Sequence, residues 1–317
     1  MSQHINRRDF VRYSVLTALG LQFLPFHGLK AAASDRVRIA HIGLGGMGLA
    51  HMNWFANLPE AEIVALCDVD EEHAKEALSQ LKKVHPDTKA QIYTDFRKVL
   101  ERQDIDAVTI ATPDHWHALQ AIAAIKSGSH VYLQKPISVD VIEGEAVVAA
   151  ARKYNKMVQV GTQRRSTPHL WDAKKQVLDG GMLGKISHVE ICCYYHMRAN
   201  GNPPVEPVPE FLDYEMWTGP APLRPYDGLP HTRWWRTFME YGNGIPGDMC
   251  VHMLDTVRWL LGLGWPKKIT ATGGIYVQKE GKSNIADTQT AIYEFDGLNV
   301  VWQHRTWGNP VDPEYPW

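Results

Sequence analysis

The chain has little cysteine, and the few cysteines present follow no ligand or disulfide pattern. Four cysteines occur among 317 residues, and no two are spaced as Cys-x-x-Cys. Cys192 and Cys193 are adjacent in a segment that reads as a strand, so their side chains should point to opposite faces. We therefore expect neither a disulfide framework nor a cysteine zinc site.

An excess of one charge and long apolar runs are also missing. Lysine and arginine number 33 against 35 aspartates and glutamates, which gives a formal net charge of -2. That balance provides no electrostatic basis for binding nucleic acid or an anionic membrane. No apolar run reaches the roughly 18–20 residues that cross a bilayer. The sequence therefore predicts no nucleic-acid partner and no membrane span.

What the chain does contain is typical of a packed globular protein. Hydrophobic residues make up 44% and charged residues 21%, which supplies enough apolar surface for a core. The length suits two domains of about 150 residues each. Most of the 11 tryptophans and 12 tyrosines follow residue 170, which indicates an aromatic-lined surface or core in the second half.

The N-terminus has the pattern of an export signal. Arg7 and Arg8 precede the moderately apolar stretch Tyr13–Phe26, and Ala31–Ala33 follows as a cleavage-type site. The paired arginines are typical of the twin-arginine route, which carries folded proteins. An amphipathic helix is the alternative, but the glycines and proline in this stretch would break it. We expect residues 1–33 to be a signal peptide that sends the protein to the periplasm through the twin-arginine export machinery.

A glycine-rich hexapeptide follows the first apolar, β-rich run of the mature chain, residues 36–42. A helical segment from about Met47 to Leu58 follows, and a second strand, Glu62–Cys67, comes next. A strand, a tight glycine turn and a helix N-terminus form the cradle that binds a dinucleotide diphosphate. The predicted diphosphate site consists of Gly43, Leu44, Gly45, Gly46, Met47 and Gly48.

An acidic residue ends the second strand, twenty residues after the last glycine of the hexapeptide. The Asp68 carboxylate is placed to accept hydrogen bonds from ribose hydroxyls and to repel a 2′-phosphate. No arginine follows it directly. NAD is therefore favoured over NADP. A purely structural glycine turn is the alternative reading.

Strands and helices continue to alternate after this motif. Buried-type strands are expected at Ala107–Ala111, His130–Leu133 and Met157–Val160, with helices at about His117–Ser127 and Val141–Tyr154. This alternation predicts a parallel sheet covered on both faces, with ligands beyond the carboxyl ends of its strands. The polar clusters at those ends occupy residues 112–117, 134–136 and 162–165.

Together these pieces resemble the Gfo/Idh/MocA oxidoreductases, the family of glucose–fructose oxidoreductase and inositol dehydrogenase. The pieces that carry the resemblance are Gly43–Gly48, Cys67-Asp68, Thr112-Pro113 with His117, Lys135-Pro136, and Asp248 with His252. The stretches from Gly161 to Arg165 and from Gly247 to Asp255 resemble its exported branch. One departure is Gln134, where the family usually has glutamate before the lysine.

The resemblance implies two domains of α/β class. Residues 34–160 would form the Rossmann NAD-binding domain, and residues 161–317 an α+β substrate and oligomerisation domain. The second domain would contain an open, mostly antiparallel sheet. Family members usually run further than Trp317, so we expect a truncation at the C-terminus. The resemblance also implies a homo-oligomer.

The second half fits this expectation. Strands are expected at 186–196, Lys268–Tyr276, Thr288–Phe295 and Leu298–His304, and a long functional loop at 200–245. A helix is expected over Gly247–Leu261. Its polar stripe, against a broad apolar face, consists of Asp248, His252 and Asp255.

The resemblance assigns the site residues. The cofactor would contact Thr112, Pro113, His117, Gln134 and Lys135. The substrate would contact Trp116, Gln163, Arg164, Arg165, Asp248 and His252. The catalytic set would be Lys135, Asp248 and His252: histidine suits the role of base at neutral pH, lysine competes for that role or polarises the reacting oxygen, and the carboxylate orients either.

Two further interpretations concern side chains around this set. Aromatic rings could stack on a sugar face or simply fill the core, and the candidates are Trp116, Trp217, Trp234, Trp235 and Tyr241. A metal site is the rival interpretation for His115, His117, His196, Asp248 and His252. Their spacing matches no ligand motif, so no metal is expected.

Three functions follow from these expectations. The first is an NAD-dependent dehydrogenase acting on a sugar or glycoside, with NAD bound tightly and loaded before export. The second keeps the hydride within the enzyme and uses a transient keto-sugar to cleave a glycosidic bond or epimerise a centre. The third is a non-catalytic, NAD-bound sensor or assembly protein, which would tolerate loss of Lys135 or His252.

Overall fold

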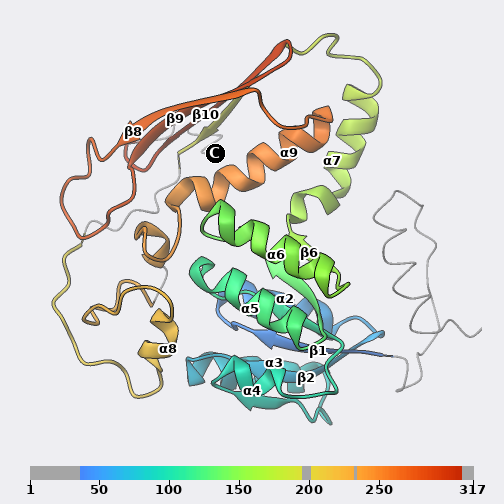
Figure 1. Ribbon diagram of the computed structural model, residues 1–317, viewed down its shortest axis with the longest axis vertical. Helices are drawn as coiled ribbons and strands as arrows, with labels where there is room; N and C mark the ends of the chain where they lie inside the picture. The colour runs from blue at the N-terminus through green and yellow to red at the C-terminus, as the bar shows by residue number, and fades with distance from the viewer. Residues whose placement is uncertain (1–35, 195–200, 232–233, 309–317) are drawn as a thin grey trace, which may run out of the picture.

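The computed structural model describes residues 36–194, 201–231 and 234–308. The predicted signal peptide, His196 and Trp317 lie outside these ranges. Two sheets dominate the architecture, one in the lower half of Figure 1 and one along its upper edge. The expected combination of a Rossmann domain with a second α/β unit is confirmed. None of the helices in the described ranges is both long and apolar enough to span a membrane.

The first sheet has six parallel strands in the order β3-β2-β1-β4-β5-β6. Its strands are β1 Val37–Ile42, β2 Ala61–Cys67, β3 Gln91–Tyr93, β4 Ala107–Ile110, β5 His130–Gln134 and β6 Val158–Gly161. The order reverses between β1 and β4. A crevice forms at such a reversal, beyond the carboxyl ends of the strands, and it is where ligands bind in sheets of this kind.

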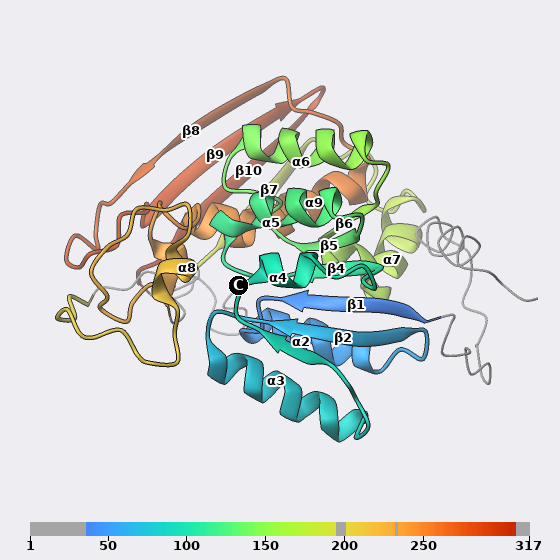
Figure 2. The ribbon, with the colours of Figure 1, turned by 60° about the horizontal axis from the view of Figure 1, so that its bottom comes forward.

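Helices cover both faces of this sheet (Figure 2). On one face α2 (Gly46–Ala56) and α3 (Glu71–Val84) pack on β2 through Met52, Leu66 and Leu81. On the other face lie α4 (Phe96–Leu100), α5 (Asp114–Lys126) and α6 (Val141–Lys153). The elements α3, β3 and α4 are not among those predicted from the sequence.

The start of α5 differs from the expectation. The helix begins at Asp114, directly after Pro113, rather than at His117. Proline presets the backbone angle that opens a helix and needs no amide hydrogen bond there. The shift places the Asp114 side chain in the first helical turn, at the carboxyl end of β4.

The second sheet has four strands in the order β7-β10-β9-β8. They are β7 His188–Cys193, β10 Leu298–Arg305, β9 Thr288–Phe295 and β8 Lys268–Gly274. β8 and β10 are antiparallel to β9, and β7 is parallel to β10. Two of the three pairings are therefore antiparallel, as expected. The first of these strands is shorter than the predicted 186–196.

One long helix covers a face of the second sheet (Figure 1). The helix α9, Val251–Leu261, packs with Trp302 and Val300 of β10 through Met253 and Val257. The sequence predicted a single regular helix from Gly247. The structure instead places a π-helical turn at Pro246–Cys250 ahead of α9, so Asp248 lies in an irregular turn. Such turns are frequent at functional sites.

The remaining segments connect the sheets. After β6 come a 3-10 turn at Gln163–Ser166 (η2), α7 at Pro168–Ala173 and a π turn at Lys174–Leu178 (η3). The predicted long loop at 200–245 contains α8, Tyr214–Thr218, and a 3-10 turn at Trp234–Thr237 (η4).

The segment around α8 folds back onto the first sheet. The Asp213 amide donates to the Val69 carbonyl at 3.0 Å, and the Glu71 amide donates to the Phe211 carbonyl at 2.9 Å. These bonds hold the second half of the chain against the carboxyl end of β2. Around them an aromatic cluster forms a separate small core.

Candidate active site

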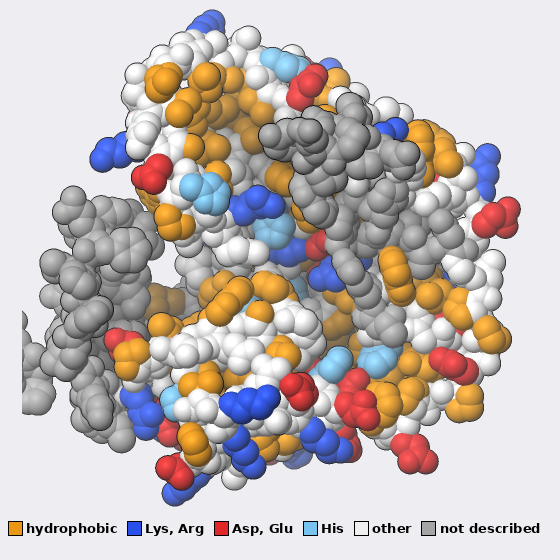
Figure 3. Space-filling view, turned by 180° about the vertical axis from the view of Figure 1, so that it is seen from behind, with side chains coloured by type: hydrophobic (Ala, Val, Ile, Leu, Met, Phe, Trp, Pro, Cys, Tyr) orange, Lys and Arg blue, Asp and Glu red, His pale blue; other side chains and the backbone are white. Residues whose placement is uncertain are grey.

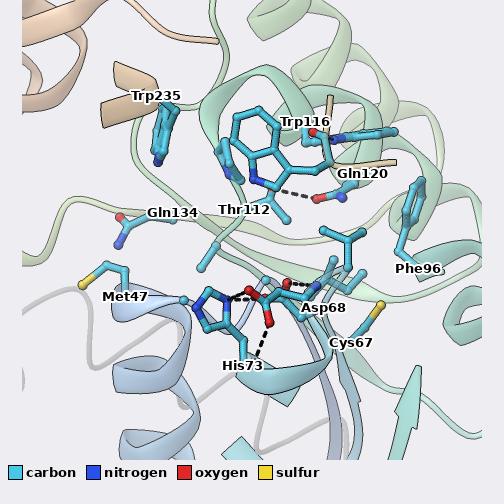
Figure 4. A pocket seen from close by; sticks show the side chains of 18 of the residues that line it. Met47, Cys67, Asp68, His73, Phe96, Thr112, Trp116, Gln120, Gln134 and Trp235 are labelled. Atoms are coloured by element: carbon cyan, nitrogen blue, oxygen red, sulfur yellow. Dashed lines mark hydrogen bonds and ion pairs between the residues drawn. The ribbon is translucent and has the colours of Figure 1, made fainter. Parts of the chain in front are cut away.

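A cavity of about 670 Å³ lies beyond the carboxyl ends of β1, β2, β4 and β5. Both halves of the chain line it (Figure 4). The wall residues from the first half of the chain include Gly43, Gly45, Gly46, Met47, Asp68, Thr112, Pro113, Gln134 and Lys135. The second half contributes Met216, Trp217, His231, Trp235 and Arg236. Seen from behind in Figure 3, histidine and basic side chains gather in the hollow between the upper and lower parts of the molecule.

The glycine loop forms one end of the cavity. Gly43 has φ +83°, and a Cβ there would lie 2.6 Å from the Thr112 nitrogen. A Cβ on Gly48 would lie 1.8 Å from the Gly43 carbonyl oxygen, so both positions require glycine. At Gly46, by contrast, a Cβ would meet nothing within 4 Å. Gly43 and Gly48 therefore shape the turn, and Gly46 leaves its surface open.

The N-terminus of α2 faces this open surface. Its N-cap is Gly45, and no side chain caps the free amides. Uncapped amides with the positive end of the helix dipole bind anions such as a diphosphate. The residues present therefore fit a dinucleotide. Leu44 serves the loop differently, because its side chain is buried and its amide donates to the Asp68 carboxylate at 2.6 Å.

The Asp68 carboxylate lies beside the glycine loop, at the end of β2. Its second oxygen accepts from the Asp70 amide at 2.9 Å, and the His73 ring lies 3.8 Å from the first (Figure 4). Burial raises the pKa of Asp68, although the bonds from the Asp70 and Leu44 amides oppose this. Both oxygens keep lone pairs for a diol. Asp68 thus lies on the cavity wall beside the glycine loop, as its position at the end of the second strand predicts.

Sequence reasoning missed the histidines and the second carboxylate next to Asp68. The Asp70 side chain is buried, and its Oδ2 lies 2.9 Å from His231 Nε2. His73 and His231 both line the cavity. The strand-end position could have indicated Asp70, but nothing in the sequence places His231 here, because it arrives through the fold of a distant segment.

A cluster of charges lies at the other end of the cavity. Lys135 Nζ is 2.5 Å from Asp248 Oδ1 and donates to the Asp248 carbonyl at 2.9 Å. Arg236 Nε lies 3.2 Å from the same Oδ1. Burial opposes ionisation of Asp248, but Arg236 and Lys135 outweigh it and hold the pKa of this carboxyl below its usual value. The two contacts of its Nζ with Asp248 therefore fix the direction of the Lys135 side chain.

His252 completes the predicted catalytic set. It is 8% exposed, and its buried Nδ1 has no hydrogen-bond partner in the part of the chain that the structure describes. Burial, with the positive charges of Lys135 and Arg164, lowers its pKa to about 4. The structure thus brings Lys135, Asp248 and His252 together. Lys135 alone of the three is on the cavity wall, since Asp248 reaches the wall only through Lys135 and Arg236.

Residues 112–117 divide between wall and core. Thr112 and Pro113 line the cavity, and the Thr112 hydroxyl donates to Gln120 Oε1 at 2.8 Å. His117 is fully buried away from the wall. Its ring nitrogens lie 2.6 Å from the Pro136 carbonyl and 2.9 Å from the Thr112 carbonyl. Its contacts join α5 to the ends of β4 and β5 rather than facing the cavity.

Gln134 lies on the wall where the family usually has a glutamate. Its Oε1 accepts from the Lys135 amide at 2.6 Å, and its Nε2 lies 3.4 Å from the His51 ring. A Cβ on Gly161 would lie 2.9 Å from Gln134 Oε1, so the neighbouring strand packs closely against this amide. The amide therefore braces the backbone of Lys135 without adding a negative charge.

The predicted substrate residues after β6 lie off the wall. Gln163 is exposed, and Arg165 forms two 2.7 Å hydrogen bonds to Asp255 on α9. Arg164 is half-buried, and its positive charge contributes to the lowered pKa of His252. The structure groups these side chains around α9, beside the charge cluster.

The aromatic candidates split between wall and core. Trp116, Trp217 and Trp235 line the cavity, and the Trp116 Nε1 donates to the carbonyls of the α8 turn at 3.1 Å. Tyr241 is fully buried, and Trp234 is half-buried and off the wall. Among the described residues, no three His, Cys, Asp or Glu side chains are grouped to hold a metal ion. His196, one member of the rival metal set, lies outside them.

Family models match both halves of the chain. A model for an oxidoreductase family with an NAD-binding Rossmann fold matches residues 37–162, and the C-terminal alpha/beta domain of the same family matches 171–302. The chain belongs to the Gfo/Idh/MocA oxidoreductase family. The Rossmann match covers the glycine loop, Asp68 and Lys135, and the C-terminal match covers Arg236, Asp248 and His252.

Two curated relatives match the chain over part of its length. A glycosyl hydrolase family 109 protein of Shewanella baltica is 31% identical over 178 residues, which cover 54% of this chain and 38% of that protein. A 4-carboxy-2-hydroxymuconate-6-semialdehyde dehydrogenase of a Sphingobium species is 29% identical over 181 residues, 57% of this chain and 55% of that protein. The matched stretch thus spans about half, or less, of these relatives.

Solved structures of similar fold cover more of the chain. GenD2 from gentamicin A biosynthesis, crystallised in complex with NAD, superposes with a TM-score of 0.68 at 18% identity. The match covers 90% of this chain and 69% of that one. At this identity the similarity establishes the fold alone.

Proposed function

We propose that the protein is an NAD-dependent oxidoreductase that moves a hydride between nicotinamide and a hydroxyl-bearing carbon of a sugar or glycoside. The observation that carries the proposal is one cavity that runs from the uncapped N-terminus of α2 to the Lys135–Asp248–Arg236 charge cluster. A nicotinamide dinucleotide would suit both ends of this cavity, because it carries a diphosphate and, further along, a redox-active ring. Family membership gives this cofactor class independent support.

The first half of the chain would hold the cofactor. The free amides at Gly45–Met47 would bind the diphosphate, and Asp68 would accept from the adenosine ribose. The Asp68 and Asp70 carboxylates favour a diol over a 2′-phosphate, which supports NAD rather than NADP. The nicotinamide, when bound, supplies the hydride acceptor. The solved relative GenD2, which is named as an NAD complex, supports the same assignment.

Side chains at the charge cluster would handle the substrate. Lys135, fixed by Asp248, would donate to the reacting oxygen and stabilise negative charge as it develops there. The sequence favours His252 as the base, but burial lowers its pKa to about 4 and it lies off the cavity wall, so its claim to that role is the weaker one. Trp116, Trp217 and Trp235 would exclude water and present apolar rings to a sugar face.

The test begins with the purified protein and its nucleotide. Heat-released nucleotide is identified chromatographically, and a panel of free sugars and glycosides is then screened with added NAD for reduced nicotinamide. The proposal predicts NADH formation with at least one alcohol of the panel, and its loss in Lys135→Ala. Failure of the folded wild type to bind any nicotinamide dinucleotide would refute it.

A redox-neutral glycosidase is the second candidate, and two observations favour it. The Shewanella baltica relative is named a glycosyl hydrolase family 109 protein. The second half of the chain also closes over the adenosine end of the cavity, through the Asp70–His231 pair and the Val69–Asp213 bond. Enclosure of this kind slows cofactor loss and suits a hydride that returns to the substrate. Aglycone release without net NADH would establish this reaction, and steady NADH release would exclude it.

We further propose that the protein is exported to the periplasm as a folded, NAD-loaded homo-oligomer. The twin-arginine pattern of residues 1–33 supports the route. Fusion of residues 1–33 to a reporter that is active only after folded export tests it, with Arg7→Lys and Arg8→Lys together as the matched control. Light scattering of the purified protein tests the oligomer. Cytoplasmic retention of the wild-type fusion would contradict the route.

A further inference from the structure

Asp114 is a buried carboxyl on the cavity wall that the predicted catalytic set does not include. It is the first residue of α5, directly after Pro113, and only 3% of its surface is exposed. Among the described residues none forms a hydrogen bond or ion pair with its carboxylate, although Asp114 lines the cavity. Asp248 differs, because its Oδ1 is held by two cations.

The charged groups that face Asp114 come from three other elements. Arg236 of η4, Lys135 at the end of β5 and Asp248 of the π turn all act on it electrostatically. His115 and His117 lie on its own helix, and burial lowers the pKa of each to about 4, so both are neutral at pH 7.

The chain closes tightly over this carboxyl. A Cβ on Gly242 would lie 3.2 Å from Asp114 Oδ2 and 3.3 Å from the Trp235 ring, so the chain passes close at this point. Burial raises the pKa of Asp114 to about 7, although Arg236 and Lys135 oppose the rise. Near neutral pH the carboxyl therefore exists in both protonation states, the condition that suits a general acid–base group.

We propose that Asp114 is the acid–base group that takes the substrate hydroxyl proton. The inference rests on the proposed oxidoreductase function and names the residue that this function requires. Two geometric facts carry it: Asp114 lines the same cavity as Lys135 and Arg236, whereas His252 does not, and no described residue bonds to the Asp114 carboxylate. A base must reach the O–H that it deprotonates.

The step balances as follows. The substrate O–H bond breaks and its proton goes to an Asp114 oxygen, while the C–H bond breaks and its electron pair passes as hydride to oxidised nicotinamide. The carbon and oxygen are left as a carbonyl. Lys135 donates a hydrogen bond to that oxygen throughout. In the reverse direction, protonated Asp114 returns its proton to the alkoxide as the hydride returns to carbon.

The test compares Asp114→Asn with two matched variants. Asparagine keeps the shape of the side chain but cannot take the proton. The active-site comparison is His252→Asn. The structural control is Asp140→Asn, which changes the cap of α6 and should remain a good cap as asparagine.

The pH profile of turnover with the substrate from the screen is the first readout. For wild type we expect an ionisation limb near neutral pH, and in Asp114→Asn a loss of that limb and a fall in kcat of about 10²-fold or more, with NAD affinity unchanged. In Asp114→Glu the limb should return in part. An unchanged limb in Asp114→Asn, together with its loss in His252→Asn, would overturn the proposal.

A second readout needs no turnover. In protein labelled with 13C at the aspartate carboxyls, one resonance should titrate near pH 7 in wild type and be missing from Asp114→Asn. Titration of that carbon near the ordinary value of about 4 would overturn the assignment. Because this measurement works without substrate, it separates failure of the Asp114 role from failure of the oxidoreductase function. If Asp114→Asn does not fold, the Asp114→Glu spectrum provides the same comparison.

Discussion

At the scale of single residues, Asp248 stands out because two cations share one of its oxygens. Lys135 Nζ and Arg236 Nε both approach Oδ1, at 2.5 and 3.2 Å. A partly buried carboxylate shared in this way fixes the direction of the lysine more than it stabilises the fold, because the desolvation of three charges offsets much of their attraction. We therefore assign Asp248 a positioning role and leave contact with the substrate to Lys135.

This role predicts the behaviour of Asp248→Asn. The lysine should lose its anchor, and turnover should fall by about 10- to 100-fold through misplacement of the donor. NAD affinity should stay within about twofold, because the diphosphate end is untouched. Steady-state kinetics and a fluorescence titration measure the two effects. Loss of NAD binding with turnover per bound cofactor intact would contradict the assignment.

Asp68 allows a second test at this scale. Asp68→Ala removes the carboxylate that faces the ribose and also its bond to the Leu44 amide. We expect NAD affinity to fall by about tenfold, as for a lost charge-assisted hydrogen bond worth roughly 1.5 kcal/mol. NADP affinity should fall less or rise. Parallel titrations with both dinucleotides measure the ratio, and an unchanged ratio would remove the argument for NAD.

At the scale of elements, the junction of β1 and α2 is the most constrained part of the fold. The turn brings the Gly48 position to within van der Waals overlap of the Gly43 carbonyl, and the open face of Gly46 points away from protein atoms. Helix α2 can approach β1 and expose its amides only because these three positions lack side chains.

This junction predicts a difference between two glycine substitutions. Gly48→Ala places a methyl group 1.8 Å from a carbonyl oxygen, and the shift required should cost about 2–4 kcal/mol. Gly46→Ala meets nothing within 4 Å and should leave the free energy of unfolding within about 1 kcal/mol of wild type. Denaturant titrations of the apo proteins compare them, and equal stability would show that the turn is not as tight as described.

Regular elements were predictable where a local pattern repeats. The strands β4 and β5 are short apolar runs bounded by polar residues, and the glycine motif ties β1 to α2, so the Rossmann half was predicted with the correct topology class. The helix α3 was missed although its sequence displays a cap at Asp70 and a buried face of Ala74, Ala77 and Leu81. The start of α5 was placed at about His117 instead of Asp114, and the π turn before α9 was not predicted, because helix ends and local backbone irregularities leave no clear periodic signal.

The site could be predicted only in part, for a related reason. Asp68, Lys135 and Asp248 follow motif or strand-end positions that the sequence displays. His231, Arg236 and the wall position of Asp114 depend on how residues 201–231 and 234–236 fold back over the sheet, and no local pattern encodes that approach. The same dependence on tertiary packing explains why His117, a motif residue, lies in the core.

At the scale of the whole molecule, buried neutral histidines make the free energy of unfolding depend on pH. Burial lowers the pKa of five described histidines to about 4 or about 3; they are His41, His51, His115, His117 and His252. In the unfolded chain each titrates near 6.5. Their contribution is thus fully present above pH 6.5 and is lost as pH falls toward 4.

The expected result is a steep loss of stability on acidification. Each histidine that takes up a proton on unfolding lowers the free energy of unfolding by about 1.4 kcal/mol per pH unit below 6.5. Unfolding at pH 5 should therefore be accompanied by the uptake of several protons per chain. Chemical denaturation from pH 7 to pH 5, with proton uptake measured in paired buffers, checks this. A flat stability between pH 7 and pH 5 would show that these rings are charged or solvated in the folded protein.

The two halves of the chain meet over one cavity, and the account depends on what that cavity holds. The most direct measurement is a crystal structure of the protein soaked with NAD. The account predicts the diphosphate against the amides of Gly45–Met47, the adenosine ribose beside Asp68, and the nicotinamide at the end that contains Lys135 and Asp114. A dinucleotide bound elsewhere, or a nicotinamide turned away from Lys135, would contradict it.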